Sequence, residues 1–187
     1  MAICYVGVVD VAQKKTKDIV VVVDAGHGGY DPGKVGISGV LVKDINLAIA
    51  CKVRRILEKE GIQVVMTRKE DVDLCAEAGG SKKSADMRKR VEIMNPCSAA
   101  VAVSIHQNSF TDASSHGSQV FYYEAAREGE TLAKTIQESI KGVITEENHR
   151  QAKPNREYYI LKKVSCPVVI VECGFLSNSV ETTKLTN

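Results

Sequence analysis

The sequence predicts a single α/β domain with a mostly parallel central sheet and helices on both faces. Short β-branched runs alternate along the chain with longer amphipathic segments, and several runs lead into glycine-rich or polar turns. Strands that alternate with helices are typical of a parallel sheet covered by helices. The length of 187 residues fits one hydrophobic core.

The first half of the chain contains two predicted strands and two predicted helices. A continuous β-branched run predicts a strand over residues 19–23, which enters the turn DAGHGG. Apolar residues at helical spacing predict a helix over residues 44–60, ended by Gly61. A second strand is expected over residues 62–66, and the polar segment 77–86 is expected to be a loop before a helix near residues 87–94.

The second half repeats this alternation. We expect strands over residues 99–105, 119–123, 158–161 and 168–171, and a helix over residues 130–144. The basic segment between that helix and residue 158 is expected to be a loop. Another helix is expected to begin after Asn178. An open sheet is normally covered by a final helix, so the predicted domain, residues 18–187, is expected to be short at its C-terminus.

Composition excludes several classes of protein. A formal net charge of +2 is too small to indicate a nucleic-acid partner. No stretch approaches the roughly 20 apolar residues of a membrane-spanning helix, so no transmembrane segment is expected. Residues 1–17 are interpreted as an N-terminal extension, and no export signal is evident because the apolar start lacks a basic leader. The six cysteines form no C-x-x-C pair, and most are expected to be small buried hydrophobes, with their disulfide state open.

Three β-rich runs each lead into a polar residue that suits a metal site: His27, His106 and Glu172. Open α/β sheets form their sites outside the carboxyl ends of the strands, so these distant residues are expected to converge. Two neutral imidazoles can bind zinc, and a nearby carboxylate can accept the proton of an attacking water. His116 and His149 lie in polar or charged loops, and we expect both to be solvated.

Several segments in register resemble the zinc-dependent N-acetylmuramoyl-L-alanine amidases, the amidase type 3 family. These segments are VVVDAGHGGYDPGKVG, KDINLAIA, ADMRKRVEIMN, AVSIHQNS and VVIVECGFLSN, while GSQVFYY and RQAKPNREYYILKK are closest to the germination-specific branch. The resemblance implies an exported enzyme of the cell wall or spore cortex that cleaves the amide between N-acetylmuramic acid and L-alanine in peptidoglycan. It also implies zinc bound by His27 and His106, Glu172 as the general base or as a stabiliser of the tetrahedral intermediate, and substrate or supporting contacts from Arg90 and Asn108.

Val42 is a departure from this family, which usually has a glutamate there as a third zinc ligand. Asp44 cannot replace it, because two positions along a helix rotate a side chain by about 200°. We therefore expect weak zinc binding and low activity, unless an activating protein partner restores the metal site.

Two alternatives stay open. One is a catalytically impaired amidase-like module that binds peptidoglycan or a partner protein, which Val42 favours. The other is a zinc carboxypeptidase or aminopeptidase, for which no residue that would capture a peptide terminus stands out.

Overall fold

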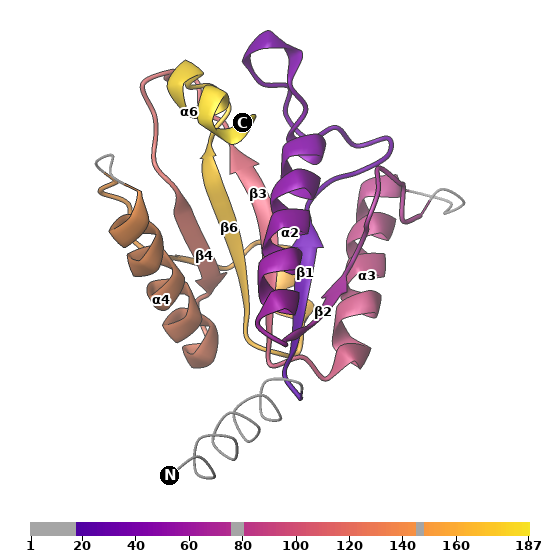
Figure 1. The fold of residues 1–187 in the computed structure, drawn as a ribbon. Coiled ribbons are helices and arrows are strands. Elements are labelled where there is room, and N and C mark those ends of the chain that lie inside the picture. The colour runs from indigo at the N-terminus through magenta and orange to yellow at the C-terminus, as the bar shows by residue number, and fades with distance from the viewer. Residues whose placement is uncertain (1–17, 76–80, 145–147) are drawn as a thin grey trace, which may run out of the picture.

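The structure, a computed structural model, describes residues 18–75, 81–144 and 148–187. The predicted extension over residues 1–17 lies outside this part of the chain, as does Cys4. A six-stranded sheet in the order β2-β1-β3-β6-β4-β5 forms the centre of the molecule (Figure 1). Its strands are β1 (Val20–Ala25), β2 (Gln63–Met66), β3 (Val101–Asn108), β4 (Gln119–Tyr123), β5 (Lys153–Asn155) and β6 (Val168–Phe175).

The predicted α/β architecture is confirmed. The pairs β1–β2, β1–β3, β3–β6 and β4–β5 are parallel, and β4–β6 is antiparallel. The direction of the chain therefore reverses once within the sheet. None of the described helices has the length and apolarity needed to cross a bilayer.

Helices cover both faces of the sheet. One face packs against α2 (Val42–Lys59) and α4 (Arg127–Val143), and the other against α3 (Lys82–Met94) and α5 (Tyr159–Lys163). The alternation of side chains along β1 explains this division, because Val21 and Val23 belong to the first core cluster and Val22 to the second. The short helices η1 (Ile37–Gly39), η2 (Asn95–Cys97) and α6 (Ser179–Leu185) complete the fold.

Two predicted elements are wrong. Residues 158–161 were expected to form a strand, but helix α5 begins at Tyr159 and buries Ile160 and Leu161. A four-residue apolar run is too short for periodicity to separate a strand from a helix. The preceding basic segment was expected to be a loop but contains β5, an edge strand that tolerates Pro154 because it pairs only with β4.

Other predictions are confirmed with shifted ends. Helix α3 begins at Lys82, so part of the expected loop is helical, and β3 and β6 continue to Asn108 and Phe175. Helix α6 begins after Asn178 as predicted, and the Asn178 side chain accepts hydrogen bonds from the backbone N–H groups of Val180 and Glu181. The described cysteines are unpaired, and four pack against the core clusters: Cys51, Cys97, Cys166 and Cys173.

Candidate active site

His27 lies just beyond β1, in a loop that is held in an unusual conformation. Its φ of 62° is in the left-handed region, which few non-glycine residues adopt. Its Nδ1 lies 2.8 Å from Asp31 Oδ2, an arrangement that orients the ring and leaves Nε2 available to a ligand. The loop thus presents one nitrogen of an oriented imidazole.

His106 approaches His27 from the neighbouring strand β3. The two ring centroids are 5.1 Å apart, with 70° between the ring planes. Burial and the nearby His27 lower the pKa of His106 to about 3, so its imidazole is neutral at physiological pH. A neutral imidazole has the lone pair that metal binding requires.

Gly26 makes room for the His106 ring. A Cβ at position 26 would lie 2.2 Å from His106 Nε2, a distance that no side chain could occupy. Glycine at position 26 is therefore explained by the packing of an imidazole against the backbone.

Glu172 is the register partner of His106 on the adjacent strand β6. Its buried Oε2 has no hydrogen-bond partner among the described residues. Burial raises the pKa of Glu172 to about 7. A carboxyl group with such a pKa can exchange protons near neutral pH.

A single pocket joins these three side chains, as the positions in the sequence predicted. The pocket has a volume of about 240 Å³, and its walls come from α3 and α5 as well as the strands. The charged and aromatic residues that line it besides the three are Asp31, Lys83, Asp86, Arg90, Tyr158 and Tyr159. His106 and Glu172 sit inside β3 and β6 rather than just after them, because both strands are longer than predicted.

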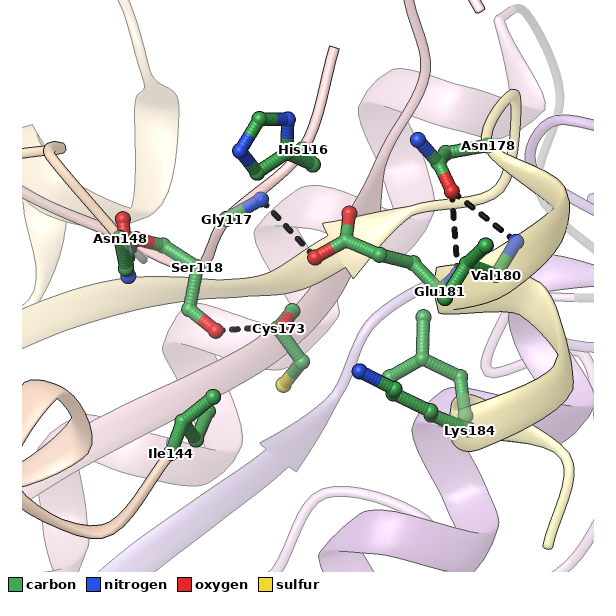
Figure 2. Close-up of a pocket in the computed structure, with 11 residues that line it drawn as sticks. His116, Gly117, Ser118, Ile144, Asn148, Cys173, Asn178, Val180, Glu181 and Lys184 are labelled. Atoms are coloured by element: carbon green, nitrogen blue, oxygen red, sulfur yellow. Dashed lines mark hydrogen bonds between the residues drawn. The ribbon is translucent and has the colours of Figure 1, made fainter. Parts of the chain in front are cut away.

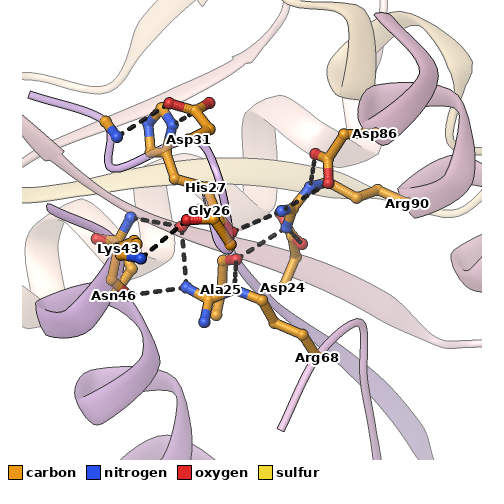
Figure 3. A network of polar contacts seen from close by, with 12 residues as sticks. Asp24, Ala25, Gly26, His27, Asp31, Lys43, Asn46, Arg68, Asp86 and Arg90 are labelled. Carbon is orange, nitrogen blue, oxygen red and sulfur yellow. Dashed lines mark hydrogen bonds and ion pairs between the residues drawn. The ribbon is translucent and has the colours of Figure 1, made fainter. Parts of the chain in front are cut away.

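Arg90 is buried beneath the pocket, in a network of charged groups (Figure 3). Its Nη1 donates to Asp24 Oδ1 at 2.6 Å, and its Nε donates to Asp86 Oδ2 at 2.6 Å. Its Nη2 donates to the backbone carbonyl of His27 at 2.7 Å. Arg90 therefore positions the His27 backbone, while contact of Arg90 with substrate stays a prediction.

The same loop is held from its other side by α2 and by the segment after β2. Arg68 Nε donates to the Ala25 carbonyl at 2.9 Å, and Asn46 Nδ2 donates to the Gly26 carbonyl at 3.0 Å. Lys43 Nζ donates to the Gly29 carbonyl at 2.9 Å. Together with Arg90 of α3, these contacts from α2 and from the segment after β2 fix the backbone around His27.

The remaining predicted positions lie elsewhere. Asn108 ends β3, and its Oδ1 accepts a hydrogen bond from the backbone N–H of Ser109, so substrate binding by Asn108 stays a prediction. His116 and His149 are exposed, as expected. His116 lines a second cavity beside α6, where Cys173 also lies (Figure 2). Because Cys173 follows Glu172 in β6, that cavity is on the opposite face of the sheet from the three converging residues.

Val42 is buried beside the His27 imidazole. A Cβ at Gly33 would lie 2.8 Å from Val42 Cβ and 2.9 Å from His27 Cδ2, so both atoms surround the same point. Within the described residues, no three His, Cys, Asp or Glu side chains come together as a metal-binding group. The described residues therefore offer two imidazoles to a metal, and a hydrocarbon group beside one of them.

Residues 21–187, which include the whole site, match the N-acetylmuramoyl-L-alanine amidase family. The chain belongs to this family. The germination-specific N-acetylmuramoyl-L-alanine amidase of Bacillus subtilis is 39% identical to this amidase over 169 residues, which are 89% of this chain and 70% of the relative. The probable cell wall amidase LytH of Staphylococcus aureus is 30% identical over 169 residues, 88% of this chain and 50% of the relative.

Solved amidases share the fold of this amidase. The CwlD amidase from Clostridioides difficile, solved in complex with the GerS lipoprotein, has a TM-score of 0.87 and 38% identity, over 91% of this chain and 89% of that one. The amidase AmiC2 of Nostoc punctiforme has a TM-score of 0.76 and 34% identity, over 90% and 86% of the two chains. These matches confirm the predicted class, a peptidoglycan amidase, and favour it over the impaired module and the exopeptidases.

Sequence reasoning missed the residues that support the site. Asp24, Asp31 and Asp86 each bond to a site residue, but their partners are set by the folded loop or by other elements. The one available signal was the charge of Asp24 at the end of a buried β-branched run, where an unpaired carboxylate would be costly.

Proposed function

We propose that this chain hydrolyses the amide bond between N-acetylmuramic acid and L-alanine in spore cortex peptidoglycan, with zinc as its cofactor. The observation that carries the proposal is the meeting of His27, His106 and Glu172 in one pocket. Similarity to the germination-specific amidase of Bacillus subtilis supports the cortex as the substrate.

Glu172 is the general base in this proposal. With a pKa of about 7, its carboxylate accepts a proton from the water that attacks the carbonyl of the lactyl amide. The resulting carboxylic acid then donates this proton to the nitrogen of L-alanine as the C–N bond breaks. The lactyl carboxylic acid and a free amine are the products, and Glu172 ends as a carboxylate.

His27 and His106 are the proposed zinc ligands. The Asp31 contact at His27 Nδ1 and the neutral state of His106 suit metal-binding imidazoles. Bound zinc supplies Lewis-acid polarisation and a water of lowered pKa. Because no third ligand joins them within the described part of the chain, the proposal is one of weak zinc binding.

We extend the proposal to location and partner. The relatives that are cell wall amidases support export of this chain to the cell wall or cortex space. The complex of the CwlD amidase with the GerS lipoprotein supports a protein partner for this chain as well. Such a partner would compensate for Val42 if it supplied or ordered a further ligand.

The test is hydrolysis of purified spore cortex peptidoglycan with added zinc. The intact chain should release new N-terminal L-alanine, measured by end-group labelling and mass spectrometry. Glu172→Gln should lower the rate by about 10²-fold or more, because it removes the proton acceptor. Glu157→Gln, an exposed glutamate outside the pocket, is the matched control.

Equal rates for Glu172→Gln and the intact chain would contradict the role of Glu172. New termini other than L-alanine would contradict the proposed bond.

A further inference from the structure

The pocket has two chemically different walls. Tyr158, Tyr159 and Ile160, at the start of α5, form one wall, and Lys83 and Met87 of α3 form the other. His27, His106 and Glu172 lie in the same pocket as both walls. A substrate with unlike halves on either side of its scissile bond would therefore meet different surfaces.

The tyrosine wall is rigid and partly open. The Tyr158 ring packs edge-to-face on Phe121 of β4, with centroids 5.6 Å apart and 84° between the planes. The backbone N–H of Tyr158 donates to Asn155 Oδ1 at 2.8 Å, which fixes the start of α5. Tyr158 and Tyr159 are 38% and 37% exposed.

Such a wall suits a sugar ring. An exposed tyrosine offers a flat apolar face and a hydroxyl at low conformational cost. A pyranose has the matching features, since it carries a face of C–H groups and a rim of hydroxyls.

The α3 wall has a cation that is not paired with the carboxylates around it. Asp31 is bonded to His27, and Asp86 is bonded to Arg90. Lys83 is near enough to Asp31 to lower the pKa of that carboxyl group, but it forms no ion pair within 4.0 Å with a carboxylate of the described residues. A lysine in this setting suits an anionic group on the substrate.

We propose that the substrate lies across the pocket with its muramyl sugar on Tyr158 and Tyr159 and a carboxylate of its stem peptide on Lys83. This inference rests on the proposed function and adds the orientation and the specificity-determining residues. Lys83 selects acidic stem peptides, because an uncharged amide in place of the carboxylate gives the ammonium no anionic partner at ion-pair distance.

The test measures binding rather than turnover, with the full chain in the presence of a chelator. The ligands are the disaccharide of N-acetylglucosamine and N-acetylmuramic acid, the same disaccharide bearing L-alanyl-D-glutamate whose γ-carboxyl is blocked as a methylamide, and the matching carboxamide form in which the α-carboxylate is an amide as well. NMR titration or calorimetry gives the three dissociation constants. The intact chain should bind the carboxylate form more tightly than the carboxamide form by about tenfold.

Each wall has its own variant and control. Lys83→Met should remove the preference for the carboxylate form and leave disaccharide binding unchanged, while Lys89→Met, on the exposed side of α3, should change neither. Tyr158→Ala should weaken all three ligands by about tenfold, and Tyr158→Phe, which keeps the ring, should weaken them much less. Phe110→Ala, an exposed aromatic outside the pocket, is the second control.

Three results would overturn the orientation. These are no disaccharide binding to the intact chain, an unchanged carboxylate preference in Lys83→Met, or unchanged disaccharide binding in Tyr158→Ala. Release of L-alanine in the presence of zinc is measured in a separate experiment. A chain that shows the expected binding pattern but releases no L-alanine would contradict the proposed function and leave the orientation intact.

Discussion

Val42 is the first residue of α2, and its side chain is 1% exposed. It packs beside Gly33 and the His27 ring, so a longer side chain at this position would point into the proposed metal site. Valine has no lone pair to give, whereas a carboxylate there would add an anionic ligand to the two imidazoles. The chemistry of the site therefore depends strongly on one buried hydrocarbon group.

The variant Val42→Glu is expected to bind zinc at least tenfold more tightly than the intact chain. Tenfold corresponds to about 1.4 kcal/mol of binding free energy. Without metal the buried carboxylate should lower the thermal unfolding midpoint, and saturating zinc should raise it again. Isothermal titration and thermal unfolding with and without zinc measure both effects. Val42→Gln, of similar size but neutral, is the control.

The gain in zinc affinity should disappear when His27→Ala is added to Val42→Glu, because a single imidazole and a carboxylate make a poorer metal site. If Val42→Glu and the intact chain bind zinc equally, position 42 does not face the metal.

At the residue scale, the sequence predicted the meeting of three side chains but not how they are held. His27, His106 and Glu172 could be found because each follows or ends a β-rich run. Asp86 could not be found, and neither could the partner of Asp24, since Arg90 lies on α3 and is brought to both carboxylates only by folding.

The element that sequence reasoning placed wrongly is α5, which forms one wall of the pocket. The chain turns before it because Asn155 Oδ1 accepts hydrogen bonds from the N–H groups of Glu157 and Tyr158. These hydrogen bonds favour a turn over an extended backbone. The spacing of apolar residues, on which the strand prediction rested, carries no information about them. By contrast, α2 and α4 were predicted almost to their ends, because their apolar stripes run over several turns.

Asn155→Ala should therefore lower the free energy of unfolding by about 1 kcal/mol, because two backbone donors lose their acceptor. Asn155→Asp keeps an acceptor oxygen and should lose less. Urea unfolding of the three chains gives the comparison. A loss as large in Asn155→Asp as in Asn155→Ala would argue against this role of the side chain.

On the scale of the whole molecule, the alternation of strands and helices was enough to predict the α/β class. The order of the strands was not predicted, nor was the antiparallel pairing of β4 with β6. Strand order depends on which faces pack together after collapse, and contacts between residues far apart in sequence leave no local pattern. The site could be anticipated because it needs only the ends of strands to share one edge of the sheet.

The buried pair of Asp24 and Arg90 links the stability of the whole domain to pH. Burial alone would raise the pKa of Asp24, but Arg90 and the hydroxyls of Ser104 and Thr67 lower it below its usual value. A depressed pKa in the folded state adds stability that is complete above the unfolded pKa of about 3.9. This contribution is lost as the pH falls through the folded pKa.

Asp24→Asn should lower the free energy of unfolding at pH 7 by about 3–5 kcal/mol, because Arg90 then keeps a buried charge with one partner fewer. The variant should also lose less stability than the intact chain on acidification below about pH 4. Denaturant unfolding across this pH range measures both effects. Asp44→Asn, at an exposed position of α2, is the control, and equal acid sensitivity of Asp24→Asn and the intact chain would contradict the role of Asp24.

Strand β6 comes last in sequence among the described strands, yet it lies between β3 and β4. A ribosome therefore releases residues 168–175 only after the other described strands have emerged. Until that point the nascent polypeptide has both imidazoles but lacks the carboxylate beside them, and the two halves of its sheet remain unjoined. The proposed proton acceptor, Glu172, therefore meets the two imidazoles only once β6 has paired with β3.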